Sequence, residues 1–206
     1  MNQASASVSV SPQEVVKLRG MTGAGFLDCK KALAESAGNV EKAKDILRSK
    51  GLAGAASKSD RVTSQGCVSS YVHHSGKVGV LLELNCETDF VAKTPDFQEL
   101  AKELALQIAA AKPRWVRQED VPKDVLEKER EIYRGQAATL GKPAGATQMI
   151  VEGKLSKFFS DFCLVEQASI RDTSGKTKIS GQIAQAIAKL GENIAVCRFV
   201  RFEVGE

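Results

Sequence analysis

The residues that first suggest chemistry are a carboxylate and a large aromatic ring side by side, Asp89 and Phe90, in the segment 85–92. A carboxylate accepts hydrogen bonds, and an exposed aromatic side chain suits a pocket on a partner. The pair also has a plainer explanation, in which Phe90 folds back over a sheet and Asp89 caps a turn. The secondary structure predicted on either side of the pair decides between partner contact and this plainer explanation.

The pair lies between a strand pattern and a helix pattern. Apolar residues alternate along 77–84, which predicts a strand with one buried face. Thr94 and Pro95 are typical of a helix start, the first as N-cap and the second at the first helical position. A strand end joined to a helix start is a rigid mount for a protruding tip. Because neither pattern includes Phe90, its ring is free to serve a partner.

The sequence offers little material for catalysis or metal binding. His73 and His74 are its two histidines, and we assign both to a turn because neighbouring residues on a strand face opposite ways. The five cysteines lack C-x-x-C spacing, and their odd number argues against a closed disulfide framework. We therefore expect no catalytic residue, no metal, no cofactor and five reduced thiols. Free thiols favour the cytoplasm or the interior of an organelle.

Size and composition indicate a globular protein with one sizeable core and a small satellite. The 206 residues are 43% hydrophobic and 26% charged, which is ordinary for such a protein. No apolar run reaches the length of a membrane span, and the first residues lack the pattern of a secretory signal. The net charge of +4 is spread along the chain. We therefore expect no direct nucleic-acid partner and no membrane contact.

A module of three short helices is predicted for residues 11–51, after a disordered tail at residues 1–10. A capping box starts the first helix, and glycines are expected to end the helices, Gly20 the first and Gly51 the third. The segment 52–60 is rich in glycine, alanine and serine, which predicts a linker. Alanine also permits a helix, so a partly helical linker is the alternative.

The remaining residues, 61–206, are predicted as an α+β core. Strand patterns at 62–72 and 77–85 form a hairpin, and a last strand pattern covers 194–204. Helical patterns lie between the hairpin and the last strand, with starts near Thr94, Pro122, Ala146 and Ser180. This order of elements predicts a small antiparallel sheet packed with helices.

Three separated blocks of the sequence resemble the signatures of one family. They are Leu18-Arg19 with residues 22–33, then residues 85–92, and finally residues 151–155 with 200–205. By these blocks the chain is identified as a member of the elongation factor Ts family, over nearly everything from Ser11 onward.

The resemblance implies a function that composition and spacing alone do not. Elongation factor Ts is a guanine-nucleotide exchange factor for elongation factor Tu, the GTPase that carries aminoacyl-tRNA to the ribosome. The family has an N-terminal module of the ubiquitin-associated type, a flexible linker and a core built on a three-stranded antiparallel sheet. Longer members carry a duplicated core and an inserted coiled coil, whereas this sequence shows one core and no heptad insert. Short members are expected to pair, so we expect a homodimer.

The resemblance also implies two surfaces for contact with the GTPase. The tip consists of Thr88, Asp89, Phe90 and Val91, and it inserts near the site of Mg²⁺ and the phosphates. The N-terminal module docks on a second patch of the same GTPase domain, through Leu18, Arg19, Met21, Gly23, Phe26 and Leu27. For the apolar members of this second set, the alternative is burial in the core of the module itself.

Two other functional classes remain open from the sequence. One is an interaction adaptor, which recruits a partner without any effect on nucleotides and is separated from an exchange factor by labelled-GDP release. The other is a hydrolase that uses His73 or His74 with a cysteine. The sequence shows no nucleophile in a recognisable setting for that chemistry.

Overall fold

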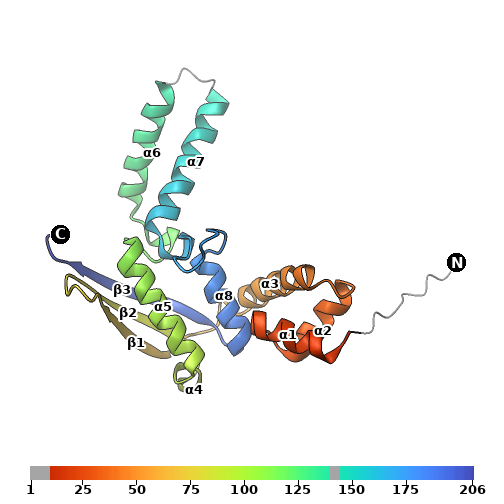
Figure 1. The fold of residues 1–206 in the computed structure, drawn as a ribbon. Helices are drawn as coiled ribbons and strands as arrows, with labels where there is room; N and C mark the ends of the chain where they lie inside the picture. Colours follow the sequence, from red (N-terminus) through yellow and green to blue (C-terminus); the bar gives the residue numbers. More distant parts are fainter. Residues whose placement is uncertain (1–9, 140–143) are drawn as a thin grey trace.

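A three-stranded antiparallel sheet carries helices on one face, with a three-helix module to one side and a projecting pair of helices to another (Figure 1). The computed structural model describes residues 10–139 and 144–206. The predicted α+β fold with its three-stranded antiparallel sheet is confirmed. The predicted tail, residues 1–10, lies outside the described residues except for its last position.

The sheet places apolar side chains toward the helices. Its strands, in spatial order, are β1 (Gln65–Val72), β2 (Val78–Cys86) and β3 (Ile194–Glu203). Alternation along β2 buries Val80, Leu82 and Leu84 on one face, as the period of two requires. His73 and His74 lie in the turn between β1 and β2, as predicted.

Two helices cover the inner face of the sheet, α5 (Pro95–Ala111) and α8 (Ile179–Leu190). The start of α5 is fixed by Thr94, whose hydroxyl accepts a hydrogen bond from the backbone N–H of Phe97 at 3.3 Å. The stripe of α5 that begins at Phe97 is buried against the sheet. The strand before the tip and the helix after it therefore belong to one packed core.

The N-terminal module consists of α1 (Pro12–Thr22), α2 (Phe26–Glu35) and α3 (Val40–Ala56). The predicted capping box at Ser11 is present. Gly20 does not end α1, however, because the left-handed cap is at Gly23, with φ of 69°. A glycine is tolerated inside a helix at about 1 kcal/mol, whereas the left-handed cap specifically favours one. The likeness of the module to the ubiquitin-associated type stays a prediction.

The third helix also runs further than predicted. It passes Gly51 and ends at Ala56, so residues 52–56 of the predicted linker are helical. A Cβ added at Gly51 would lie 3.5 Å from the Cβ of Ala188 in α8, and Ala55 is buried in the main core. Packing against α8 therefore outweighs the helix-ending tendency of a glycine. This is the partly helical alternative, and the division of the chain into separate domains stays a prediction.

The projecting pair consists of α6 (Lys123–Ala138) and α7 (Ala144–Phe162), which run side by side in Figure 1. They share an apolar seam that includes Ala137, Val151 and Leu155. The helical patterns predicted to start near Pro122 and Ala146 are therefore confirmed, and the two helices pack against each other. Each helix has at most 19 residues, and that is too short for the three or four heptads that a coiled-coil pattern needs.

Short 3-10 turns at Gln118–Asp120 and Leu164–Glu166 complete the connections around this pair.

Within residues 10–139 and 144–206, no helix combines the length and the hydrophobicity that crossing a membrane requires.

Candidate functional site

The Asp89-Phe90 pair lies on one short helical turn, α4 (Asp89–Ala92), between the end of β2 and the start of α5 (Figure 1). Thr88 is the N-cap of this turn, and its hydroxyl accepts a hydrogen bond from the backbone N–H of Val91 at 3.4 Å. The predicted connection therefore has a regular structure, which gives each of its side chains a defined direction.

The turn has an outward side and an inward side. Phe90 is 81% exposed, whereas Ala92 is buried and Val91 packs against the main core. The alternative in which Phe90 folds back over the sheet is therefore wrong. Large aromatic side chains usually dominate core and interface energetics because they bury so much surface. A ring this exposed at the end of a strand is a candidate anchor for a partner.

Asp89 is paired with its neighbour on the same turn. The Nζ atom of Lys93 lies 2.6 Å from the carboxylate of Asp89, and both side chains are at least half exposed. The hydrogen bond from Lys93 holds the pKa of the Asp89 carboxyl below its usual range, so the group is ionised at neutral pH. Exposed ion pairs of this kind contribute little stability. A partner group can therefore replace Lys93 with little loss to the fold.

Side chains of α5 fix the far end of the turn. The hydroxyl of Thr94 donates to the carbonyl of Val91 at 2.7 Å, and Nε2 of Gln98 donates to the carbonyl of Ala92 at 2.6 Å. These bonds satisfy carbonyl groups that a helix of four residues leaves without internal partners. The α4 turn is therefore held by polar contacts as well as by its chain connections to β2 and α5.

Most of the residues predicted for partner contact in the N-terminal module are exposed. Met21 is 50%, Phe26 44% and Leu27 68% exposed, and Arg19 on α1 is exposed as well. Leu18 is fully buried in the core of the module. It faces inward because it lies three residues after Val15, on the apolar stripe of α1. We therefore assign Leu18 to the fold of the module and not to a contact surface.

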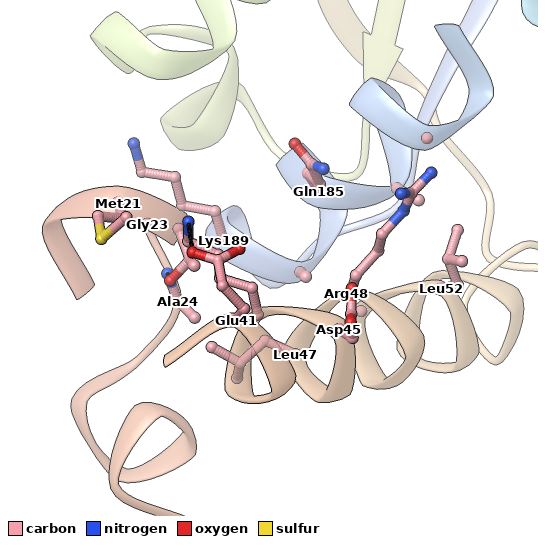
Figure 2. A pocket seen from close by; sticks show the side chains of 16 residues that line it. Met21, Gly23, Ala24, Glu41, Asp45, Leu47, Arg48, Leu52, Gln185 and Lys189 are labelled. Atoms are coloured by element: carbon pink, nitrogen blue, oxygen red, sulfur yellow. Dashed lines mark hydrogen bonds and ion pairs between the residues drawn. The ribbon is translucent and has the colours of Figure 1, made fainter. Parts of the chain in front are cut away.

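A cleft of about 430 Å³ is lined by residues of the module and of α8. Figure 2 shows it between the turn at Gly23, the side of α3 and the end of α8. Its lining carries both signs of charge, with Asp45 and Arg48 from α3 and Lys189 from α8. A Cβ added at Gly23 would lie 3.3 Å from Cδ of Lys189. The predicted residue Gly23 therefore lies where the module approaches the core.

The outer face of the sheet forms a surface that sequence reasoning missed. Its exposed apolar side chains, which we call the outer sheet patch, are Val68, Val72, Leu81, Val200 and Phe202. Ladder pairing places Leu81 opposite Val200, so the patch continues from strand to strand. The signal was present in β3, where apolar residues occur on both alternating faces.

The cysteines do not form a reactive site. Burial is the main cause that raises the pKa of Cys67, Cys86 and Cys163, the last to about 11. Thiols with raised pKa values stay protonated at neutral pH and are poor nucleophiles. All five cysteines are free thiols. Within the described residues, no three histidine, cysteine, aspartate or glutamate side chains gather in a way that could hold a metal ion.

Comparison with known proteins gives the family. A family model described as Elongation factor TS matches residues 55–206, which include the tip and the whole sheet. The chain belongs to the elongation factor Ts family. This membership makes it a translation elongation factor.

Individual relatives of the family match at high identity. The chain is 57% identical to elongation factor Ts of Fervidobacterium nodosum over 199 residues, which cover 97% of this chain and 100% of that protein. It is 58% identical to elongation factor Ts of Thermotoga neapolitana over 199 residues, with 97% and 99% covered. The relative from Carboxydothermus hydrogenoformans is 53% identical over 197 residues, with 96% and 90% covered. The similarity to elongation factor Ts thus extends over the N-terminal module as well as the core.

Proposed function

We propose that this protein is a guanine-nucleotide exchange factor that binds elongation factor Tu in its GDP form and promotes release of GDP. One observation carries the proposal: Phe90 is 81% exposed on a turn whose two ends are fixed by hydrogen bonds. The turn with Thr88, Asp89, Phe90 and Val91 is inserted near the Mg²⁺ and phosphate site of the GTPase. The protein itself performs no covalent chemistry and needs neither a cofactor nor a metal.

Exchange by this mechanism depends on differential binding. A factor weakens nucleotide binding only if it binds the nucleotide-free GTPase more tightly than the nucleotide-bound form. A thousandfold acceleration of release requires about 4 kcal/mol, since each factor of ten is about 1.4 kcal/mol. Burying one phenylalanine contributes roughly 1.5–3 kcal/mol. Phe90 therefore supplies a large part of the effect, and Asp89 and further contacts supply the rest.

The N-terminal module provides a second contact with the same GTPase. Its exposed apolar side chains, Met21, Phe26 and Leu27, would be buried in the complex together with Arg19. The contacts of Lys189 support the proposal that the module and the tip bind the GTPase from the same side of the protein. The Nζ atom of Lys189 lies 2.7 Å from Asp96 at the start of α5, and its aliphatic stem lies against Gly23. One side chain of α8 thus bridges the turn of the module and the helix that follows the tip.

A second copy of the chain is the partner that best suits the outer sheet patch. The patch has exposed apolar side chains on all three strands and lies on the face opposite the helices. Contiguous apolar surface of this kind is characteristic of interfaces between copies. The protein therefore functions as a homodimer. We further propose that it works in the cytoplasm or the interior of an organelle, without direct contact to nucleic acid or membrane.

Molar mass measured by light scattering tests the dimer. We expect the unmodified protein to have twice the mass of one chain, and Phe202→Asp to have the mass of one chain at the same concentration. Met149→Asp introduces the same charge at a residue of α7 that is 74% exposed, and it serves as the matched control that remains a dimer. A single-chain mass for the unmodified protein would remove the second copy from the proposal.

Release of fluorescently labelled GDP from elongation factor Tu tests the exchange function. The rate is measured with excess unlabelled GDP, with and without this protein. We expect the protein to accelerate release by orders of magnitude and to form a stable complex with the nucleotide-free GTPase. A complex that forms without any change in the release rate would make the protein an adaptor instead.

A further inference from the structure

Two connections of the core meet at the base of the tip. One joins β2 to α4 and contains Glu87 and Thr88, and the other joins α8 to β3 and contains Glu192 and Asn193. The carboxylate of Glu192 accepts two hydrogen bonds from Thr88, from its backbone N–H at 3.0 Å and from its hydroxyl at 2.7 Å. The N-cap of the tip is therefore held by a residue 104 positions away in the sequence.

The interaction is reciprocal. The carboxylate of Glu87 accepts a hydrogen bond from the backbone N–H of Asn193 at 2.7 Å. That N–H group is the main cause that lowers the pKa of the Glu87 carboxyl, so Glu87 is ionised at neutral pH. Each connection thus gives a carboxylate to the backbone of the other. We call these four residues, Glu87, Thr88, Glu192 and Asn193, the carboxylate clasp.

The clasp also holds the chain that leaves the N-terminal module. The side-chain amide of Asn193, which is buried, donates to the carbonyl of Ser59 at 3.2 Å and to that of Arg61 at 2.9 Å. The guanidinium of Arg61 in turn lies 3.4 Å from the carboxylate of Glu87. Three segments that are distant in the sequence therefore meet at one point below the tip.

The geometry of α4 depends on such external contacts. A helix of four residues has no stability of its own, because nucleation of the first turn is unfavourable. The hydroxyl of Thr88 can donate only one hydrogen, and Glu192 accepts it. A lone pair of the hydroxyl is thereby directed to the backbone N–H of Val91, which it caps. Glu192 thus orients the cap, and the cap fixes the direction of Phe90.

We propose that Glu192 is a positioning residue for nucleotide exchange, which holds the α4 turn in the orientation that presents Phe90 to the GTPase. The inference rests on the proposed exchange function and adds to it a residue outside the contact surface. Without the clasp, Phe90 is still present and still exposed, but its turn is ordered only when the partner binds. That ordering opposes binding, so exchange becomes about tenfold slower while the global fold is kept.

The test replaces Glu192 with an isosteric amide. Glu192→Gln keeps the volume but removes the charge and leaves one acceptor oxygen for the two donors of Thr88, so at least one of the two donations to residue 192 is lost. Glu131→Gln is the matched control, since Glu131 is an exposed carboxylate on α6. A second variant, Glu87→Gln, weakens the clasp from the opposite connection. It keeps the test valid if Glu192→Gln fails to fold.

Two readouts separate positioning from a general structural role. The first is amide hydrogen exchange of residues 87–93 in the protein alone, which we expect to become faster in Glu192→Gln and to be unchanged in Glu131→Gln. The second is a double-mutant cycle on catalysed GDP release. We expect Glu192→Gln to slow release about tenfold in the unmodified protein and less than twofold in the background of Phe90→Ala, because it acts through that ring.

The outcomes also distinguish this inference from the proposed function. If the unmodified protein accelerates GDP release and Glu192→Gln does so equally well, the positioning role is wrong and the exchange function stands. If Glu192→Gln slows release by the same factor with and without the ring of Phe90, Glu192 acts elsewhere and the inference is also wrong. Faster amide hydrogen exchange at residues 87–93 in Glu192→Gln supports the clasp, whatever the effect on GDP release. If the unmodified protein does not accelerate GDP release, however, the role of Glu192 in nucleotide exchange is refuted together with the proposed function.

Discussion

The tip and the N-terminal module present apolar side chains in different ways. The tip presents a single ring, Phe90, on a short turn held by a hydrogen bond from Thr94 and by one that Thr88 donates to Glu192. The module presents Met21, Phe26 and Leu27 on longer helices whose opposite sides form a small apolar core. The tip therefore takes its geometry from polar contacts to the main core, whereas the module takes its geometry from hydrophobic packing of its own.

This difference indicates how each region should respond to substitution. In the module, apolar residues that are close in sequence have opposite roles, so burial must be known before a role is assigned. At the tip, stability and contact are separated more cleanly, because Phe90 packs on nothing that the fold needs. Substitutions in the two regions therefore test this contrast.

Leu18→Ala should destabilise the module. Leu18 is fully buried there, and truncation of a buried leucine to alanine usually lowers the free energy of unfolding by about 2–5 kcal/mol. A core this small tolerates such a loss poorly. Thermal unfolding followed by circular dichroism, together with proteolysis of residues 11–56, measures the effect. If stability is unchanged, Leu18 does not belong to the core of the module, and the contrast between the two regions weakens.

Leu27→Ala makes the same chemical change on the surface of the module. Because Leu27 is 68% exposed, we expect the melting temperature to be unchanged. The affinity for nucleotide-free elongation factor Tu should fall by about 1 kcal/mol, or roughly fivefold, if the side chain is buried in the complex. Titration calorimetry with the two leucine variants side by side gives the comparison. Unchanged affinity would remove Leu27 from the contact surface.

The smallest expected effect concerns the ion pair of the tip. Lys93→Ala removes the group that lowers the pKa of Asp89, so the carboxyl should titrate closer to its ordinary value of 3.8. A lowered pKa in the folded state adds stability above the unfolded pKa, and this contribution is lost as the pH falls through the folded value. In the variant, the stability that the Asp89 carboxylate contributes should therefore change less as the pH falls. Carboxyl chemical shifts followed by NMR from pH 2 to 6 measure it, and an unchanged midpoint would mean that Lys93 does not control Asp89.

Local patterns in the sequence were sufficient to predict much of the core. Alternation along 77–84 gave the buried face of β2, and the cap at Thr94 gave the start of α5. These features depend on neighbours within a few residues, so the sequence contains them directly. The exposure of Phe90 was predicted for the same reason, because neither of the flanking patterns includes it.

Features that depend on distant contacts were left open as alternatives or were not predicted at all. The continuation of α3 past Gly51 depends on Ala188, and the clasp joins Thr88 to Glu192 across 104 positions. The burial of Leu18 was left open as an alternative, because the spacing along α1 marks an apolar stripe but not which of its residues the other two helices cover. In each case the deciding partner comes from another element, and local propensity cannot identify it.

Catalysed GDP release by Phe90→Ala is the most direct test of the central claim, that the exposed ring serves the partner and not the fold. At a melting temperature close to that of the unmodified protein, we expect release from elongation factor Tu to be about thirtyfold slower, which corresponds to about 2 kcal/mol of lost preference for the nucleotide-free state. Contacts from the module should still hold the complex together. A release rate equal to that of the unmodified protein would contradict the account, because the ring would then be exposed without serving exchange.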